Sequence, residues 1–354
     1  MKIALIGEFS SLHKYLKEGL KELGHEIILL STGDGYKKIG GFDYSLGKIT
    51  NSYSIYQRIK YCLSTKGIVS KIRDYDCVQL IHTNVFPLYL NEQLVRRLKV
   101  ENRMLSLVSA GSDYAFYRAY KTGKYEYHPY NFFPCSNYDG KIKSMWQRKS
   151  AKTVENLSDV IIPSLYEYTL GYNTKKLYSV VPFPINVKGI EFNENKPNDR
   201  IVFFHGLNRE IKKGTTLIRA AMERLKKKYP NDVDIIIDGH MPFDKYTELM
   251  KKTNVVIDQT YGYGYGINSC IALAQGKVVV NPCKQEQIDS MGATYNPFIS
   301  INPDADDIYE KLCWIVENRN KIVDISINGR QFVEQNHDHI MIAQKYMDAW
   351  KSVM

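Results

Sequence analysis

The stretch Lys2–Ser31, KIALIGEFSSLHKYLKEGLKELGHEIILLS, decides how the chain folds. It opens with a short apolar run that ends at Gly7, which predicts a buried β-strand followed by a turn. Apolar residues then recur at helical spacing as far as Gly24, a typical helix stop, and EIILLS predicts the next strand. Strand, glycine, helix and strand at this spacing indicate a right-handed βαβ unit in a parallel sheet.

The same order of elements returns in the second half of the chain. IVFFHG predicts a strand that ends at Gly206, TTLIRAAMERLKKKY predicts a helix, and VDIIIDG predicts the following strand. Other apolar runs of strand length are CVQLIHT, MLSLVSAG, DVIIPS and YSVVPF in the first half, and VVIDQ, KVVVNP and FISI in the second. The sequence therefore predicts an α/β protein with two tandem Rossmann-like, doubly wound parallel-sheet domains.

The boundary between these domains falls in VPFPINVKGIEFNENKPNDR, which is polar and contains three prolines. We expect an N-terminal domain at residues 1–183 and a second domain at residues 184–336. Residues 337–354 predict an amphipathic C-terminal helix that could pack back on the N-terminal domain.

Composition narrows the class of protein. The apolar runs are too short to span a bilayer, and the start MKIALIGEF lacks a secretory apolar region, so a cytoplasmic location is expected. The six cysteines show no metal-ligand spacing, so we expect reduced thiols and no bound metal.

The positive charge is unevenly distributed. Met1–Phe183 carries 26 lysines and arginines against 16 acidic residues, whereas the remainder carries 22 of each. A basic half favours anionic partners such as the inner membrane surface, or is simply a solvated basic face. No nucleic-acid recognition motif accompanies the charge, so nucleic acid is not expected as a partner.

A basic loop, LNREIKKGTT, follows the predicted strand that ends at Gly206. In a parallel α/β sheet, ligands bind beyond the carboxyl ends of the strands. Arg209 and Lys213 at such an edge, next to a helix that begins after Gly214, predict a site for an anion such as a diphosphate. A basic loop in water is the alternative.

A glycine-rich turn follows the strand VVIDQ in the same domain. Gln259–Lys277 reads QTYGYGYGINSCIALAQGK, in which alternate glycines permit a close backbone approach to a ligand. Ile267 to Gln275 predicts a helix that stops at Gly276, and the free amides at its start would face a phosphate. Two anion sites on two crossovers of one domain are a stronger signal than either alone.

These motifs occur in an order that resembles the C-terminal domain of family-four-like retaining glycosyltransferases of the GT-B fold. MKIALIGEF, GHEIILLS, LVSAGSDY and SDVIIPS look like the N-terminal domain of that family. The resemblance implies two domains facing a cleft, with a nucleoside-diphosphate sugar held by the second. Arg209 and Lys213 would neutralise the donor diphosphate, without a cofactor. The residues expected to bind the donor are Gly206, Asn208, Asp258, Gln259, Gly264, Tyr265, Gly266, Ile267, Asn268, Ser269 and His240.

The sequence departs from the family at two places. Tyr263 and Ile271 stand where relatives carry two glutamates, and Ala110 stands where many carry a histidine. Same-face attack assisted by the leaving phosphate, which the resemblance implies, requires no protein nucleophile. A metal-independent sugar transferase is therefore expected, and a non-catalytic relative that binds nucleotide or glycan is the alternative.

The acceptor is expected in the first domain, as a glycan or lipid-linked glycan. Glu8, Phe9 and Ser10 follow the first strand and are candidates to contact it. Asp113 could orient an acceptor hydroxyl as a catalytic residue, or could cap a helix. The tyrosine-rich segment Ser112–Ser150 suits either sugar and lipid head-group binding or a packed insertion.

Overall fold

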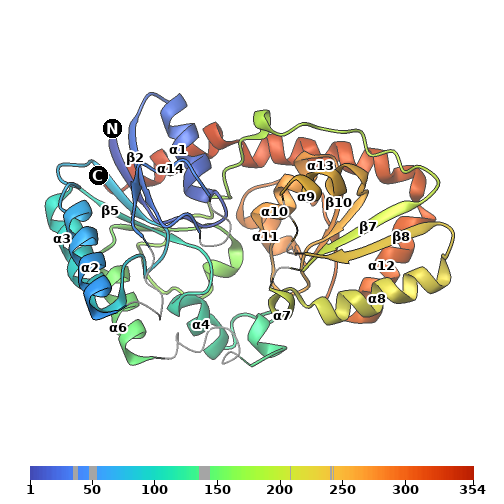
Figure 1. Ribbon diagram of the computed structural model, residues 1–354, viewed down its shortest axis with the longest axis horizontal. Helices are drawn as coiled ribbons and strands as arrows, with labels where there is room; N and C mark the ends of the chain where they lie inside the picture. Colours follow the sequence, from blue (N-terminus) through green and yellow to red (C-terminus); the bar gives the residue numbers. More distant parts are fainter. Residues whose placement is uncertain (35–38, 48–53, 135–143, 208, 240, 242) are drawn as a thin grey trace. The chain divides into compact units, whose positions relative to one another are not determined.

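The computed structural model describes residues 1–34, 39–47, 54–134, 144–207, 209–239, 241 and 243–354 (Figure 1). The chain forms two compact units. The first contains Met1–Tyr125, Pro134–Asn186 and His339–Met354, and the second contains Glu126–Phe133 and Val187–Asp338.

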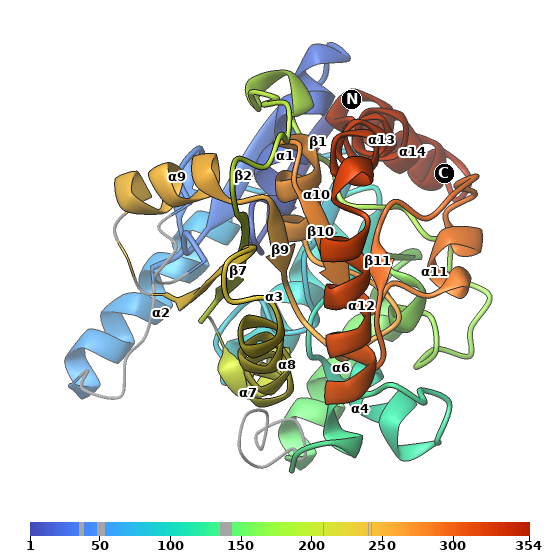
Figure 2. The same ribbon diagram turned by 90° about the vertical axis from the view of Figure 1, so that its right-hand side faces the viewer.

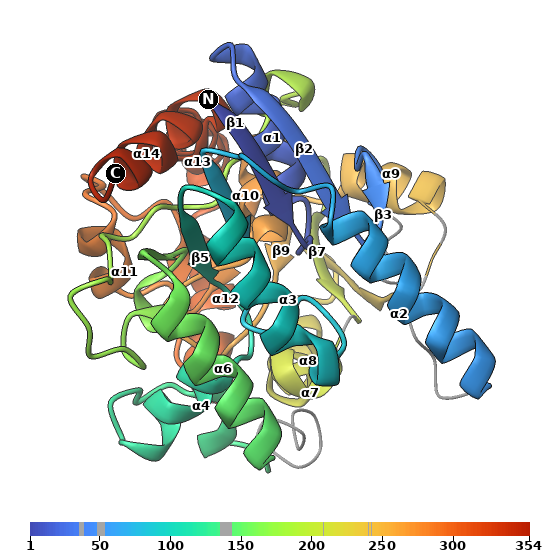
Figure 3. The ribbon, with the colours of Figure 1, turned by 90° about the vertical axis from the view of Figure 1, so that its left-hand side faces the viewer.

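The first unit is built on a six-stranded parallel sheet in the order β3-β2-β1-β4-β5-β6 (Figure 3). Its strands are β1 (Lys2–Ile6), β2 (Glu26–Ser31), β3 (Tyr44–Ser45), β4 (Cys77–Leu80), β5 (Leu105–Ser109) and β6 (Val160–Pro163). Its helices are α1 (Leu12–Glu22), α2 (Ile55–Val69), α3 (Leu88–Glu101), α4 (Tyr114–Lys121), α6 (Met145–Leu157) and α14 (His339–Lys351). Ala4 and Ile6 on β1 face a core shared with α2, α3 and α6.

The second unit is built on a five-stranded parallel sheet in the order β11-β10-β9-β7-β8 (Figure 2). Its strands are β7 (Ile201–Gly206), β8 (Val233–Asp238), β9 (Val255–Ile257), β10 (Val278–Asn281) and β11 (Ile299–Ser300). Its helices are α7 (Glu210–Lys213), α8 (Thr215–Lys228), α9 (Phe243–Lys252), α10 (Ile267–Ala274), α11 (Gln285–Ser290), α12 (Ala305–Glu317) and α13 (Ile322–His337). The central strands are buried on both faces, as in sheets covered by helices on each side.

The predicted fold class is confirmed by these two parallel sheets. Both glycine stops lie where the sequence placed them: Gly24 follows α1 at φ +81° and Gly276 follows α10 at φ +83°. The predicted strand Tyr178–Phe183 is wrong, because this segment makes only isolated backbone bonds to β6, among them Tyr178 N–H to the Ile161 carbonyl at 2.8 Å. Pro182 lacks an N–H group, which prevents a regular ladder.

The C-terminal helix α14 packs on α1 within the first unit. Trp350 is fully buried, and its indole N–H donates to Gln79 Oε1 on β4 at 3.2 Å. The same oxygen accepts from Ser106 Oγ at 3.1 Å, and the Gln79 amide lies 3.3 Å from His13 Nε2. One buried glutamine therefore joins α14, β5 and α1 to the central strand of the sheet.

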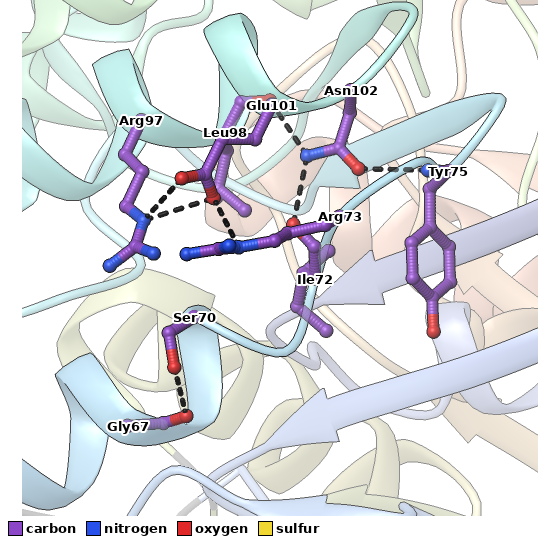
Figure 4. A network of polar contacts seen from close by, with 9 residues as sticks. All are labelled: Gly67, Ser70, Ile72, Arg73, Tyr75, Arg97, Leu98, Glu101 and Asn102. Carbon is purple, nitrogen blue, oxygen red and sulfur yellow. Dashed lines mark hydrogen bonds and ion pairs between the residues drawn. The ribbon is translucent and has the colours of Figure 1, made fainter.

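A polar network anchors the carboxyl end of α2 to α3 (Figure 4). The Asn102 amide donates to the carbonyls of Ile72 and Leu98, at 3.1 and 2.8 Å, and its oxygen accepts the Tyr75 N–H at 3.0 Å. The oxygen and the amide nitrogen of Asn102 thus both have partners, which ties the segment after α2 to the end of α3.

The approach of α1 to α14 depends on the absence of a side chain at Gly19. A Cβ atom there would lie 2.2 Å from the His339 carbonyl oxygen, which is backbone and cannot rotate away. Gly19→Ala should therefore lower the free energy of unfolding of the first unit by about 1–3 kcal/mol. Chemical denaturation followed by circular dichroism measures this change.

Gly67 provides the matched control. It lies in α2, and a Cβ atom there would meet nothing within 4 Å. Gly67→Ala should raise stability by about 0.5–1 kcal/mol, because alanine favours the helix. Equal effects of the two substitutions would contradict the close packing of α1 on α14.

Candidate functional site

The order of strands in the second sheet reverses at β7, which lies between β8 and β9. The chain leaves β7 toward β8 on one side, whereas β9 pairs with β7 on the other. Ligands of such sheets bind beyond the carboxyl ends of the strands where the order reverses. The basic loop after Gly206 and the glycine-rich turn after Ile257 both begin at this position.

The two loops are bonded directly to each other. The Thr260 N–H donates to the Lys213 carbonyl at 3.0 Å. Gly214 lies between them at φ +71°, and a Cβ atom there would lie 2.1 Å from Thr260 Oγ1. Only glycine fits this conformation and this space, so the loops form one rigid surface.

An ion pair joins the same two loops. Lys213 Nζ lies 2.9 Å from Asp258 Oδ1, and the side chains are 14% and 7% exposed. Asp258 Oδ2 accepts from Ser269 Oγ at 2.8 Å. Burial alone would raise the pKa of Asp258, but the Lys213 charge and the Ser269 hydroxyl hold the pKa below its ordinary value. Asp258 is therefore a carboxylate at neutral pH and fixes both the lysine and the start of α10.

His205 braces the sheet beneath this pair. Its Nδ1 lies 2.8 Å from the Ile257 carbonyl oxygen, and its Nε2 lies 2.8 Å from Thr215 Oγ1. A carbonyl only accepts, so Nδ1 carries the proton and Nε2 accepts from the threonine hydroxyl. Burial lowers the pKa of His205 to about 4, so the ring is neutral and structural at physiological pH.

Arg209 is the exposed cation of the site. It adopts a left-handed conformation, φ +63°, at the start of the short helix α7. No side chain or carbonyl in the described part of the chain bonds to its guanidinium. A fork of N–H groups held at the carboxyl edge of a sheet is suited to bind a phosphate.

The glycine-rich turn is anchored by its three tyrosines. Tyr261 stacks on Phe132 at 4.7 Å between ring centroids, and Tyr263 meets Tyr127 edge-on at 5.2 Å. All three tyrosines, including Tyr265, are at most 8% exposed. The alternating glycines therefore let successive tyrosines reach different parts of the core, and the turn is ordered.

The third tyrosine lies in an aromatic cluster of the second unit. The Tyr265 hydroxyl lies 2.9 Å from His337 Nε2, and its ring packs on Phe298 with centroids 4.5 Å apart. The side chain is directed into the core, so we leave Tyr265 out of the proposed site.

Helix α10 begins at the same edge. Its first residue is Ile267, which is buried, and Gly266 precedes the helix without a side chain to cap it. Asn268 is exposed on the first turn. The uncapped amides give this end a partial positive charge beside the Lys213–Asp258 pair.

The structure thus brings together several of the predicted donor residues and separates others. Lys213, Gly206, Asp258 and Ser269 form one bonded group, since Lys213 Nζ also lies 3.5 Å from the Gly206 carbonyl. The Gln259 amide instead donates to the Tyr261 carbonyl at 3.3 Å. Asn208 and His240 lie outside the described residues.

The glycines also differ in their roles. Gly262 adopts φ +115°, whereas neither Gly264 nor Gly266 has a positive φ. A Cβ atom at Gly266 would approach Asp258 Oδ2 only to 3.6 Å, an ordinary contact. Gly214 and Gly262 are therefore the glycines that the backbone requires here.

The segment Glu126–Phe133 was missed as part of this domain by sequence reasoning. The Tyr127 carbonyl accepts the Gly262 N–H at 3.1 Å, and Lys284 Nζ lies 4.9 Å from the centre of the Tyr127 ring. The segment therefore belongs to the second unit. Its tyrosines and phenylalanines were visible as a cluster, but no local signal pairs them with residues 130 positions away.

In the first unit, the order of strands reverses between β1 and β4. Glu8 follows β1 and is 4% exposed. Its Oε2 accepts the Lys14 N–H at 2.8 Å, whereas its Oε1 is buried with no bonding partner among the described residues. Burial raises the pKa of Glu8 to about 7, against the opposing effect of the α1 amides.

The residues next to Glu8 have a strained backbone. Ser10 and Ser11 are both left-handed, at φ +52° and +74°, and the Ser10 N–H donates to Asp34 Oδ2 at 2.9 Å. Phe9 meets the ring of His82 edge-on, with centroids 5.6 Å apart. Consecutive left-handed serines are unfavourable and are typical of functional loops.

Asp113 occupies the helix-cap position that was the alternative to a catalytic role. Its Oδ1 accepts the Phe116 N–H at 2.8 Å at the start of α4, and its Oδ2 lies 3.5 Å from the Tyr172 hydroxyl. Because both oxygens are engaged and the side chain is buried, we leave Asp113 out of the proposed reaction.

No group of three metal-ligating side chains lies together in the described ranges. None of the helices in those ranges is both long and apolar enough to cross a membrane.

The raised pKa of Glu8 predicts how stability depends on pH. The native state favours the protonated carboxyl of Glu8. Its contribution to the free energy of unfolding is therefore fully present below pH 4.5 and is lost as the pH rises through about 7. Glu8→Gln, which has no charge to bury, should gain about 3 kcal/mol over the natural protein between pH 4 and pH 8. Urea denaturation at both pH values tests this.

The exposed Glu26 is the control for that experiment. Glu26→Gln should show the same difference from the natural protein at pH 4 and pH 8. A Glu8→Gln variant that behaves in the same way would show that Glu8 is not protonated in the native state at neutral pH.

Several solved structures are similar to this chain. The Anabaena protein HepE in complex with UDP and glucose is 12% identical, with a TM-score of 0.64, covering 99% of this chain and 100% of that one. A sucrose-phosphate synthase from Thermosynechococcus elongatus is 12% identical, with a TM-score of 0.67 and 99% of each chain covered. The UDP-GlcNAc 2-epimerase of Neisseria meningitidis bound to UDP-GlcNAc is 12% identical, with a TM-score of 0.56, covering 99% and 100%.

No protein-family model matches the chain, and no curated protein matches it. At these identities the structural likeness shows the fold alone. The chain has a GT-B-like fold with two Rossmann-like parallel sheets.

Proposed function

We propose that the second unit binds a nucleoside-diphosphate sugar and that the protein transfers the sugar to a glycan or lipid-linked glycan. The observation that carries this proposal is the bonded group of Lys213, Asp258 and Ser269 at the strand-order reversal. It holds a cation and an uncapped helix start at one edge, beside the exposed Arg209.

The fold neighbours support a nucleotide-sugar ligand. HepE was solved with UDP-glucose, and the epimerase of Neisseria meningitidis with UDP-GlcNAc. The HepE and sucrose-phosphate synthase structures have TM-scores of 0.64 and 0.67, against 0.56 for the epimerase. These scores concern the fold; the resemblance of the sequence motifs to retaining glycosyltransferases is what favours transfer over epimerisation in this proposal.

The residues of the site have distinct roles in the proposed transfer. The diphosphate lies at the start of α10, where Arg209 and the free amides stabilise the charge that develops as the glycosidic bond breaks. Lys213 lies beside it, held in position by Asp258. The acceptor hydroxyl attacks on the same face, and the leaving phosphate takes its proton, so no metal is required.

The sugar pocket differs from that of glutamate-bearing relatives. Tyr263 is held by Tyr127, and Ile271 is half-buried on α10. Both Asp258 oxygens are engaged by Lys213 and Ser269. Asn268, exposed on the first turn of α10, is therefore the polar side chain that we assign to the sugar hydroxyls.

Arg209→Ala tests the diphosphate site. Because the guanidinium is exposed and unbonded in the described structure, the variant should fold normally yet bind UDP roughly tenfold or more weakly, and lose transfer. Isothermal calorimetry with UDP and a radiolabelled-donor transfer assay measure both. Lys213→Ala should also abolish transfer, with an added loss of stability because Asp258 is left unpaired.

Arg224→Ala is the matched control, because Arg224 is an exposed arginine of the same unit that pairs with Asp306. It should leave UDP affinity and transfer unchanged. Natural affinity and transfer in Arg209→Ala would refute the site. UDP-GlcNAc converted to its epimer without any acceptor would indicate epimerisation, and binding without turnover on any donor would indicate a non-catalytic relative.

The first unit offers a surface for a membrane-borne acceptor. Four apolar residues of α2 project into solvent, Ile55, Tyr56, Ile59 and Leu63, each 54–79% exposed. Arg58, Lys60 and Lys66 lie on the same helix. An apolar helix face with basic neighbours binds anionic lipid surfaces, and the excess charge of Met1–Phe183 has the complementary sign.

Vesicle sedimentation tests this surface. Ile59→Ser/Leu63→Ser should reduce binding to phosphatidylglycerol vesicles several-fold without lowering the melting temperature, because both side chains are exposed. As a control, Val100→Ser/Trp314→Gln replaces two other exposed apolar side chains and should leave vesicle binding unchanged. Undiminished vesicle binding by the α2 variant, or none by the natural protein, would rule out this face.

A further inference from the structure

The second unit has a cavity at the edge of its sheet opposite to the candidate diphosphate site. It has a volume of about 650 Å³, and its walls include Arg200, Asn254 and Lys277. These residues immediately precede β7, β9 and β10, so the cavity lies at the amino edge. The six residues of β7 separate it from the diphosphate site by roughly 15–20 Å, which makes it an independent cavity.

Lys277 is the unusual residue of this cavity. The residue is 4% exposed overall, but its Nζ is not among the fully buried polar atoms, so the ammonium reaches the cavity. In the part of the chain that the structure describes, no hydrogen bond, ion pair or aromatic ring contacts this ammonium group. Buried charges in proteins are normally paired. Burial lowers the pKa of Lys277 below its ordinary value, as expected for an ammonium group without a compensating anion.

The frame around Lys277 is rigid and internally satisfied. Asn195 and Asn254 form a reciprocal pair, with the Asn254 amide donating to Asn195 Oδ1 at 2.7 Å and the Asn195 amide to the Asn254 carbonyl at 2.9 Å. Asn254 Oδ1 also accepts the Val202 N–H at 2.9 Å. The backbone at Gly276 packs against Asn193: a Cβ atom at position 276 would lie 2.4 Å from the Asn193 carbonyl oxygen. None of these hydrogen bonds involves the Lys277 ammonium.

The remaining charges of the cavity wall are unbalanced. Glu194 pairs with Lys196 at 2.7 Å, and Asp234 pairs with Arg200 at 3.0 Å. Lys251, Lys252 and Lys277 then face a single further carboxylate, that of Asp199. The cavity is therefore positively charged, which favours an anion with more than one negative charge.

The wall also indicates the rest of the ligand. It contains no aromatic side chain on which a nucleobase could stack, and Val202 is its one large aliphatic residue among those described. Asn198 and the Asp199 carboxylate are suited to bind hydroxyl groups. A volume of this size accommodates a small metabolite.

We infer that the amino edge of the second sheet is a binding site for a small hydroxylated phosphate ester, with Lys277 as its central cation. The site requires neither the proposed transfer reaction nor its donor. Its occupant supplies the anion that the Lys277 ammonium lacks.

Calorimetry at constant ionic strength tests this site, with glucose 6-phosphate and inorganic phosphate as probes and glucose as the neutral comparison. The natural protein should bind glucose 6-phosphate saturably and more tightly than phosphate, and should not bind glucose. Lys277→Met, which keeps the volume without the charge, should weaken glucose 6-phosphate binding roughly tenfold or more. UDP affinity should be unchanged.

Lys227→Met is the matched control, because Lys227 is exposed on α8 of the same unit. It should bind glucose 6-phosphate like the natural protein. Without ligand, the melting temperature of Lys277→Met should be no lower than that of the natural protein, because the Lys277 ammonium makes no stabilising contact when the site is empty. A marked fall in melting temperature would show a structural lysine instead.

If Lys277→Met fails to fold, Lys251→Ser/Lys252→Ser replaces it, since both side chains are exposed. This variant should bind glucose 6-phosphate several-fold more weakly. Absence of saturable binding by the natural protein, or equal binding by the variants, would overturn the site. Phosphate bound as tightly as glucose 6-phosphate would show that the hydroxyl groups are not recognised, which contradicts the ester assignment.

Discussion

The Lys213–Asp258 ion pair is the interaction on which the candidate site depends. It joins the loop after β7 to the loop after β9, and Ser269 extends the connection to helix α10. Within a protein, a buried pair holds its geometry firmly because each partner would be unfavourable alone. The pair thus sets the position of two loops and a helix start that come from separate parts of the sequence, while Gly214 allows the loops to touch.

The sheets were predictable from the sequence because each buried strand is a continuous apolar run between glycines and polar turns. The edge at which we propose a ligand site followed from the parallel topology, and so did the placement of Lys213 and Asp258 at that edge. The failures have a common physical cause, which is tertiary contact. Nothing local in YSVVPF shows that it makes isolated bonds to β6, and nothing local in Glu126–Phe133 shows that this segment belongs to the second unit.

The tyrosines illustrate the same limit in the glycine-rich turn. Alternating Tyr and Gly suggests a mobile loop or a ligand-facing surface, and both interpretations assume that the side chains are free. Their partners, Tyr127, Phe132 and His337, lie far away in the sequence. Lys277 could not be recognised for a different reason. It begins the apolar run KVVV, which predicts a buried strand, and the excess positive charge around it comes from loops elsewhere in the sequence.

The position of α14 in the first unit has a consequence for the order in which the protein forms during synthesis. Residues His339–Met354 complete a unit that begins at Met1, and the second unit lies between them in the chain. Until residues 339–354 are translated, α1 lacks the helix that covers it and Gln79 lacks the Trp350 indole. Of these two units, the second therefore has its whole sequence available first, and the first closes after it.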